Sequence, residues 1–259
     1  MIGNNKIVSY FTYYDETCQE MLELHVNTLK NFVDEFIICE SNKTQSGIPI
    51  QYKLKDRIIE FGLPKDKIRI IELNIPDDND LMPIPLDYLN SEGDNRNNLN
   101  SVRARTRERL QRDALMVVLD DYDDNTMFIV GDCDEILKPN LISMIFFNAS
   151  ARKDILIDIP LVYLQGRADL RSYDVSGAPS PWNGNLFVCF KHHLREFSPI
   201  LIRSRQSTFE RCVITIDNNP VTDLGWHFSW MGSSEKRIAK RDAFCHHEDV
   251  FEFNGTVSY

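Results

Sequence analysis

Apolar runs alternate with segments of helical spacing along the first 75 residues of the chain. Short apolar runs at 6–11, 36–39 and 68–75 predict strands, a polar turn is expected at 12–17, and 55–61 predicts a short helix. Between the first two runs, apolar residues recur at spacings of three and four, which predicts another helix: Cys18, Leu22, Val26, Leu29 and Val33. Strands that alternate with helices predict an α/β fold with a mostly parallel, doubly wound sheet flanked by helices.

The pattern changes after residue 75. From about 76 to 98, Asp, Asn, Pro and Gly replace most apolar residues, which predicts a mobile loop able to act as a lid. Helical spacing returns over 99–119. We expect its apolar residues to face inward and its arginines to face mostly solvent: Val102, Leu110, Ala114 and Val117 in the first group, and Arg103, Arg105, Arg107, Arg109 and Arg112 in the second.

The second half of the chain predicts further strands and two helices. Pro139 is a good first-turn residue for a helix over 141–147, and Ser233 or Ser234 is placed to cap a last helix near 235–243. The expected strands lie at 154–163, 186–190, 211–217 and 224–231, with a Gly- and Pro-rich stretch at 166–185.

Composition narrows the function classes. The formal net charge is −10 and the pI about 5.1, which argues against a general affinity for nucleic acid or anionic membranes. The six cysteines include no Cys-x-x-Cys pair, so neither a zinc cluster nor a disulfide framework is indicated. Since the N-terminus lacks an apolar signal core and no apolar run approaches the ~18 residues of a membrane span, we expect a soluble, cytoplasmic protein.

The most informative chemistry follows the apolar run 128–131, which ends at Asp132, Cys133 and Asp134. A buried strand would bring both carboxylates to the sheet edge beyond its carboxyl end, where α/β proteins bind ligands. Carboxylate oxygens bind Mg²⁺ and Mn²⁺, and such an ion can bridge a diphosphate. We therefore predict a metal or phosphate site here; the alternative is an Asx-type turn with a capping carboxylate.

Other side chains are candidates for the same site. Arg112 is placed to reach a phosphate or ribose, or it is simply one of several arginines on a helix face. Glu135 is either an acid supporting the aspartates or a solvated side chain. Trp182 is a candidate to stack on a sugar; the alternative is that it fills the core of a loop.

His227, within an aromatic strand, is a candidate third metal ligand, with a packed core histidine as the alternative. His246 and His247 are its rivals. Glu235 opens the last predicted helix. It is a candidate general base for an incoming hydroxyl, or a carboxylate favoured by the helix dipole.

Four blocks together resemble a known family. They are the segment Phe36–Thr44, the pair Gln111-Arg112, the segment Gly131–Ile136 and the segment Gly225–Gly232. In this order, within a match spread over about 6 to 248, they look like the family 17 glycosyltransferases. Known members of that family are β-1,4-mannosyl-glycoprotein β-1,4-N-acetylglucosaminyltransferases.

The resemblance implies a GT-A-type nucleotide-sugar fold in one domain over 1–259, with the acceptor side at about 160–259. It implies an inverting enzyme that moves a sugar from a UDP-sugar donor, UDP-GlcNAc first, to a hydroxyl of a glycan acceptor, with Mn²⁺ or Mg²⁺ as cofactor. The residues to which it assigns roles are Asp132 and Asp134 (metal and diphosphate), Glu40 and Arg112 (nucleotide) and His227 (metal).

Unlike the animal members, this chain shows no membrane anchor and no stem. A bacterial or viral surface polysaccharide, a lipid-linked sugar or a protein glycan is therefore the expected acceptor. Two other functions remain open. Paired aspartates also serve metal-dependent phosphohydrolases, and a non-catalytic sugar-binding module would use the aspartates only structurally.

Overall fold

The computed structural model of the chain describes residues 6–83, 99–166, 168, 171, 173, 181–182, 185–216 and 219–244. Most of the predicted mobile loop, from residue 84 to 98, lies outside the described residues. So do the two rival histidines, His246 and His247.

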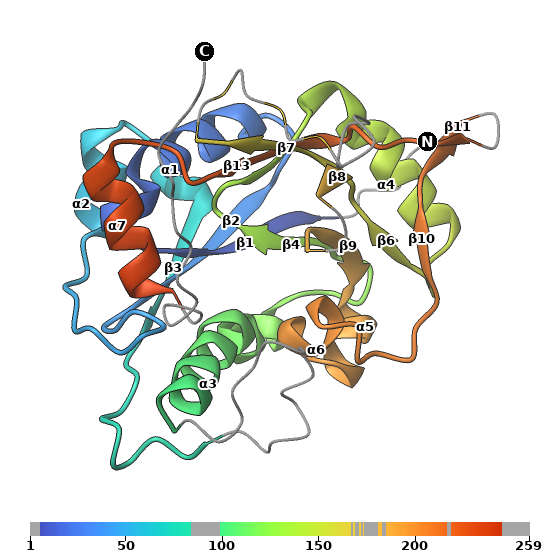
Figure 1. Cartoon of the computed structure of the whole chain (residues 1–259). Coiled ribbons are helices and arrows are strands. Elements are labelled where there is room, and N and C mark those ends of the chain that lie inside the picture. The colour runs from blue at the N-terminus through green and yellow to red at the C-terminus, as the bar shows by residue number, and fades with distance from the viewer. Residues whose placement is uncertain are drawn as a thin grey trace.

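A seven-stranded sheet forms the centre of the molecule (Figure 1). Its order is β10-β6-β9-β4-β1-β2-β3. The strands are β1 (Ile7–Tyr13), β2 (Glu35–Ser41), β3 (Ile68–Leu73), β4 (Met127–Asp132), β6 (Leu156–Asp158), β9 (Phe187–Phe190) and β10 (Arg211–Val213). The β1–β2, β1–β4, β2–β3 and β6–β10 pairs are parallel, whereas β9 runs antiparallel to β4 and β6. The predicted α/β class with a mostly parallel central sheet is confirmed.

A second, four-stranded sheet has the order β5-β13-β7-β8. Its strands are β5 (Glu135–Leu137), β7 (Leu161–Gln165), β8 (Pro181–Trp182) and β13 (Gly225–Ser229), and a separate short hairpin joins β11 (Thr215–Ile216) to β12 (Asn219–Pro220). The prediction of one strand over 154–163 is wrong, because β6 and β7 belong to different sheets. Pro160 lies between them, and a proline has no N–H to continue a ladder.

Helices cover both faces of the central sheet (Figure 1). They are α1 (Asp15–Leu29), α2 (Leu54–Glu60), α3 (Leu99–Asp113), α4 (Ile142–Ala151), α5 (Lys191–Glu196), α6 (Pro199–Arg203) and α7 (Ser234–Ala243), with 3₁₀ turns η1 (Lys65–Lys67), η3 (Ala114–Asp121) and η4 (Pro139–Leu141). The Ser233 hydroxyl accepts a hydrogen bond from the backbone N–H of Lys236, so Ser233 caps α7.

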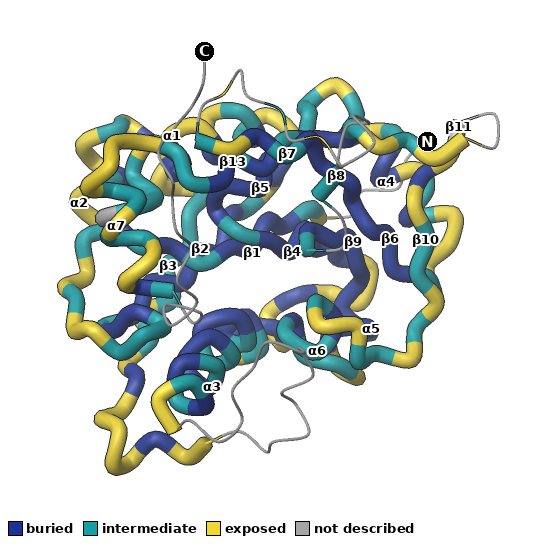
Figure 2. Tube along the Cα trace, viewed as in Figure 1, coloured by how far each residue is buried: buried dark blue, intermediate teal, exposed yellow. Residues whose placement is uncertain are grey.

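Two apolar clusters make up the core, one on each face of the central sheet. Alternate residues of a strand point to opposite faces. Phe36 and Ile38 of β2 therefore join α1, α2 and α4 in one cluster, whereas Ile37 and Cys39 join η3 and α6 in the other. Strands β1, β2 and β4 are accordingly buried along most of their length (Figure 2).

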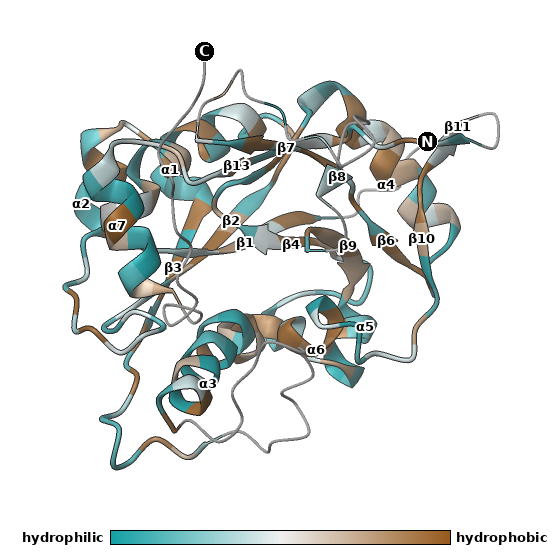
Figure 3. Cartoon of the chain, in the orientation of Figure 1, coloured by the Kyte–Doolittle hydropathy of each residue, from teal (hydrophilic) through white to brown (hydrophobic). Residues whose placement is uncertain are grey.

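Helix α3 differs from the predicted orientation. Arg107 and Arg112 are buried, whereas Val117 is 79% exposed, beyond the end of the α-helix in η3. Figure 3 shows hydrophilic residues along α3, and Figure 2 shows that much of the helix is nevertheless buried. The prediction of solvated arginines fails for these two because this face of α3 packs on polar partners rather than on an apolar core.

The segment predicted as a polar turn at 12–17 is more regular than expected. β1 continues through Tyr13, and α1 begins at Asp15. The buried Asp15 carboxylate accepts hydrogen bonds from the Tyr13 hydroxyl at 2.6 Å and from Arg57 Nε at 2.8 Å. Burial alone would raise the pKa of Asp15, but the hydrogen bonds from Arg57 and Tyr13 outweigh it and lower the pKa to about 2.

Asp15→Asn is expected to lower the free energy of unfolding by about 1–2 kcal/mol at neutral pH. Because the pKa of Asp15 lies below its ordinary 3.8 in the folded state, this stabilisation is complete above about pH 4 and is lost as the pH falls towards about 2. Urea unfolding of both proteins across this range measures the difference, with the exposed Asp66→Asn as control. A difference that does not shrink at low pH contradicts this explanation.

None of the helices among the described residues has both the length and the apolar character that a membrane crossing requires.

Candidate active site

A cavity of about 680 Å³ lies at the carboxyl ends of β1, β2 and β4. Thr12 and Tyr13 line it from the end of β1, Ser41 from the end of β2, and Asp132 and Asp134 from the end of β4. This is the edge at which open α/β sheets bind ligands, and the volume suits a small organic ligand. The structure thus brings both predicted aspartates into one cavity.

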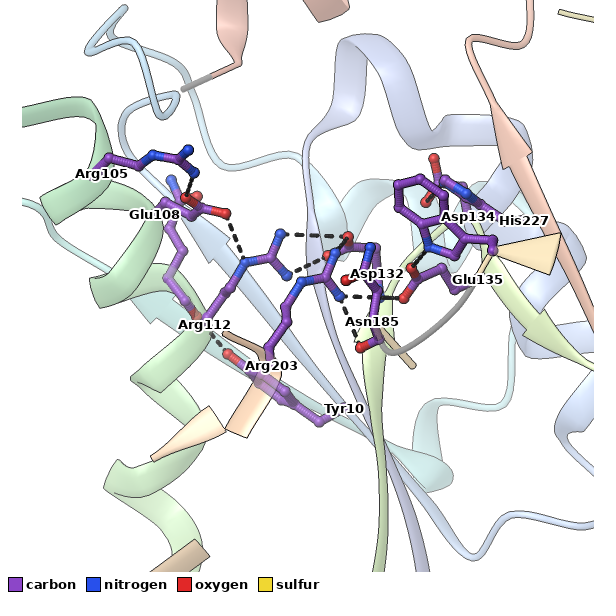
Figure 4. Close-up of polar contacts among 12 residues, drawn as sticks. Tyr10, Arg105, Glu108, Arg112, Asp132, Asp134, Glu135, Asn185, Arg203 and His227 are labelled. Carbon is purple, nitrogen blue, oxygen red and sulfur yellow. Dashed lines mark hydrogen bonds and ion pairs between the residues drawn. The ribbon is translucent and has the colours of Figure 1, made fainter. Parts of the chain in front are cut away.

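The first wall of the cavity carries ionic side chains. Arg112 of α3 donates to Asp132 Oδ1 at 2.6 Å, and Arg203 of α6 donates to Asp132 Oδ2 at 2.6 Å. Figure 4 shows both guanidinium groups directed at this carboxylate. Burial opposes the ionised form of Asp132, but Arg112 and Arg203 outweigh it and lower the pKa of this carboxyl group. Asp132 is therefore ionised at neutral pH.

The ionic wall continues along α3. Arg112 Nε donates to Glu108 Oε1 at 3.1 Å, and Arg105 donates to Glu108 Oε2 at 2.8 Å. Burial raises the pKa of Glu108, yet Arg112 and Arg105 outweigh this and hold the pKa at about 2. Arg105, Glu108, Arg112, Asp132 and Arg203 thus form a chain of alternating charges along the cavity, and we call it the ionic wall (Figure 4).

Asp134 has a different set of partners. Lys240 of α7 donates to Asp134 Oδ2 at 2.8 Å, and His227 Nε2 of β13 lies 3.7 Å from Asp134 Oδ1. Burial works against the ionised carboxylate, but Lys240 and His227 outweigh it and lower the pKa of Asp134, while Asp134 in turn raises that of Lys240. One residue of separation is therefore enough to give the two aspartates entirely different surroundings.

Glu135 lies behind the two aspartates and is buried. Its carboxylate accepts from the backbone N–H of Asp132 at 2.9 Å, from Trp182 Nε1 at 2.7 Å and from Arg203 Nη1 at 3.4 Å. Gly131 leaves the space for it, because a Cβ there would lie 2.8 Å from Glu135 Oε2. The interpretation of Glu135 as a supporting acid agrees with these contacts.

The second wall of the cavity comes from the four-stranded sheet and carries aromatic rings, and we call it the aromatic wall. Tyr163 of β7, Trp182 of β8 and His227 of β13 line the cavity. The Tyr163 and Trp182 ring centroids are 5.3 Å apart with planes at 27°, and the Trp182 and His227 centroids are 4.3 Å apart. The three rings therefore pack against one another at this wall of the cavity.

A buried histidine holds the turn between the aspartates. His25 of α1 donates from Nδ1 to the carbonyl oxygen of Cys133 at 3.0 Å, and its Nε2 lies 3.4 Å from the Ser9 hydroxyl. Burial lowers the pKa of His25 to about 4. The ring is therefore neutral at physiological pH and carries its proton on Nδ1, which fixes the backbone between Asp132 and Asp134.

The side chains at this site include the types of donor that bind divalent metal ions. Asp132 and Asp134 offer carboxylate oxygens and His227 an imidazole nitrogen, donors that Mn²⁺ accepts. Among the described residues, however, no three acidic, histidine or cysteine side chains already form a metal-binding group. Such a site would take its remaining ligands from substrate phosphate or water, as magnesium sites usually do.

Two predicted site residues lie elsewhere. Glu40 is buried, and its carboxylate accepts from the backbone N–H groups of Lys53 and Leu54, so it satisfies the first turn of α2. Glu235 is exposed in the first turn of α7, where a hydrogen bond from Ser233 lowers its pKa. Neither is among the described residues that line the cavity.

Three residues that line the cavity were not recognised from the sequence. Arg203 and Lys240 come from helices 71 and 106 residues away from the aspartates that they contact, and Tyr163 stacks on its partners from β7. A Ser-Pro helix start at Ser198 and Pro199 was the available signal for α6. No signal in the sequence indicates which acid these cations contact.

No family model and no curated protein matches the chain, so the resemblance to family 17 stays a prediction. Among solved structures, 4-diphosphocytidyl-2C-methyl-D-erythritol synthase is similar at 10% identity with a TM-score of 0.41, covering 85% of this chain and 94% of that one. A mycobacterial protein is similar at 15% identity with a TM-score of 0.35, covering 74% and 55%.

GalNAc-T7, in a structure with UDP, GalNAc and Mn²⁺, is similar at 11% identity with a TM-score of 0.45, covering 76% of this chain and 38% of that one. The chain thus spans less than two thirds of the length of the last two proteins. At these TM-scores the likenesses carry no argument about function.

Proposed function

We propose that this protein is a GT-A-type glycosyltransferase that moves a sugar, GlcNAc first, from a UDP-sugar donor to a hydroxyl of a glycan acceptor. The observation that carries the proposal is the cavity with two unlike walls at the carboxyl end of the parallel strands. The ionic wall suits the diphosphate and the aromatic wall suits a sugar. The sequence resemblance to family 17 supports the choice of UDP-GlcNAc and of inversion.

The cations of the cavity have a direct role in this reaction. Loss of the nucleoside diphosphate leaves negative charge on its phosphate oxygens, and fixed cations that face these oxygens stabilise the transition state. Arg112, Arg203 and Lys240 line the cavity and are held by Asp132 and Asp134. The aspartates thus orient the groups that bind the donor.

A divalent ion held by Asp132, Asp134 and His227 would supply further neutralisation of the diphosphate. The acceptor hydroxyl must also lose a proton. The pKa values of Glu108, Asp132 and Asp134 are all lowered by neighbouring cations, which makes these carboxylates weak bases. Glu235 remains our sequence-based candidate for the base, without support from its position on α7.

Calorimetric titration with UDP, CDP and GDP, followed by UDP release from a panel of UDP-sugars with glycan acceptors, tests the proposal. We expect UDP to bind most tightly and one UDP-sugar to be turned over faster when Mn²⁺ and acceptor are present than with EDTA. Hydrolysis of simple phosphate esters without any sugar would instead establish a phosphohydrolase. Glycan binding without nucleotide binding would establish a sugar-binding module.

A further inference from the structure

We propose that the aromatic wall is a hexopyranose subsite, with Trp182 as its platform and Glu135 as the residue that positions Trp182. The inference rests on the proposed function, because it assigns the sugar of that reaction to one wall of the cavity. A pyranose presents a face of C–H groups with hydroxyls at its rim, and an aromatic ring offers the large apolar surface on which that face can pack.

Two of the three rings remain accessible from the cavity, whereas His227 is buried. Tyr163 and Trp182 are only partly buried and both line the cavity. Their planes are within 27° of each other, and the planes of Tyr163 and His227 are within 22°. Rings that stack at these distances brace one another, so the indole of Trp182 is held in one orientation at the cavity wall.

The indole of Trp182 is held in place from behind. Its Nε1–H donates to Glu135 Oε1 at 2.7 Å, and Glu135 is itself fixed by the backbone N–H of Asp132 and by Arg203. A platform with a fixed orientation loses little side-chain entropy when a ligand binds. Glu135 also links the two walls, because it accepts from Arg203 of the ionic wall (Figure 4) and from Trp182 of the aromatic wall.

Polar groups stand at the rim of this surface. Gln165 at the end of β7, Ser229 at the end of β13 and Asn185 before β9 line the cavity with the rings. Pockets for small polar ligands combine apolar surface with a few placed hydrogen-bonding groups. Amide and hydroxyl side chains both donate and accept, as sugar hydroxyls require.

The test compares Trp182→Ala with Trp226→Ala in the full chain. Trp226 belongs to β13 of the same sheet, and it is not among the described residues that line the cavity, so it is the matched control. Calorimetry measures binding of UDP, of UDP-GlcNAc and, with UDP present, of the methyl pyranosides of glucose, galactose, mannose and N-acetylglucosamine. Circular dichroism and thermal melting confirm that each variant is folded.

We expect Trp182→Ala to bind UDP like the wild type and to bind sugar about tenfold more weakly, equivalent to about 1.4 kcal/mol, while Trp226→Ala binds both normally. If the subsite holds the donor sugar, Trp182→Ala should bind UDP-GlcNAc no more tightly than it binds UDP. If the subsite holds the acceptor, only the pyranosides are affected. Trp182→Phe keeps a ring and is expected to retain most of the sugar binding.

Unchanged sugar binding in Trp182→Ala would overturn the inference. It would also be overturned if the wild type binds UDP but binds UDP-GlcNAc no more tightly and binds none of the pyranosides. The proposed function fails separately, if the wild type binds no nucleotide. In that case a loss of pyranoside binding in Trp182→Ala would still establish the sugar subsite.

Discussion

Asp134→Asn is expected to reduce sugar transfer about a hundredfold or more, the usual effect of losing one fixed electrostatic group in an active site. The substitution keeps the shape of the side chain and removes its charge. Lys240 then loses its anionic partner, and the predicted metal site loses one carboxylate. Both changes weaken the stabilisation of the departing nucleoside diphosphate. The rate of transfer should therefore fall while the folded structure persists.

Initial rates of UDP release with donor and acceptor measure this effect, and circular dichroism checks the fold. The control is Asp121→Asn, which neutralises an exposed aspartate paired with Arg69, and neither residue is among the described residues that line the cavity. Transfer by Asp134→Asn at the wild-type rate would show that the predicted role of Asp134 is wrong. Equal losses with and without Mn²⁺ would assign the effect to Lys240 rather than to a metal.

The sequence predicted the main elements of the fold and the centre of the site. Apolar runs bounded by polar residues identify β1, β2 and β4, because the buried strands of a parallel sheet are apolar on both faces. The edge strand β3 is only partly buried, and its isoleucines still mark it as a strand. Strand β4 ends at Asp132, and Asp134 follows two residues later, so both carboxylates lie at the sheet edge beyond its carboxyl end. These inferences depend only on local sequence, and the structure agrees with each of them.

Helix α3 shows where such reasoning stops. Its arginines were expected mostly in solvent, where arginine is usually found, with Arg112 also a candidate to reach a phosphate or ribose. Arg112 is buried because it finds Glu108 on its own helix and Asp132 on β4. The pairing with Asp132 requires the sheet, the helix and the crevice between them to exist first. No local pattern carries that information.

Glu40 shows that a buried acid near a site can have a structural partner. The resemblance assigned it to the nucleotide, and its position at the end of β2 is close to the cavity edge. In the structure two backbone N–H groups of α2 take up its carboxylate. The first N–H groups of any helix need acceptors, so a nearby buried acid can serve a helix start as well as a ligand.

Arg112→Met is expected to lower the free energy of unfolding by about 2–3 kcal/mol, at or just below the lower end of the range for breaking a buried ion pair. The methionine fills much of the volume but leaves Glu108 with Arg105 alone and Asp132 with Arg203 alone. The cost stays moderate because each acid keeps one cation and water in the cavity can reach it. Urea unfolding followed by circular dichroism measures the change.

Two further variants separate charge from packing. Arg195→Met, at an exposed arginine paired with Asp124, should change the stability by less than about 1 kcal/mol. Adding Asp132→Asn to Arg112→Met should recover part of the lost stability, since the carboxylate that has lost one of its two cations is then neutral, while Arg203 keeps Glu135. If the double variant is no more stable than Arg112→Met alone, the cost of removing Arg112 lies in packing. The ionic wall would then be a feature of donor binding rather than of folding.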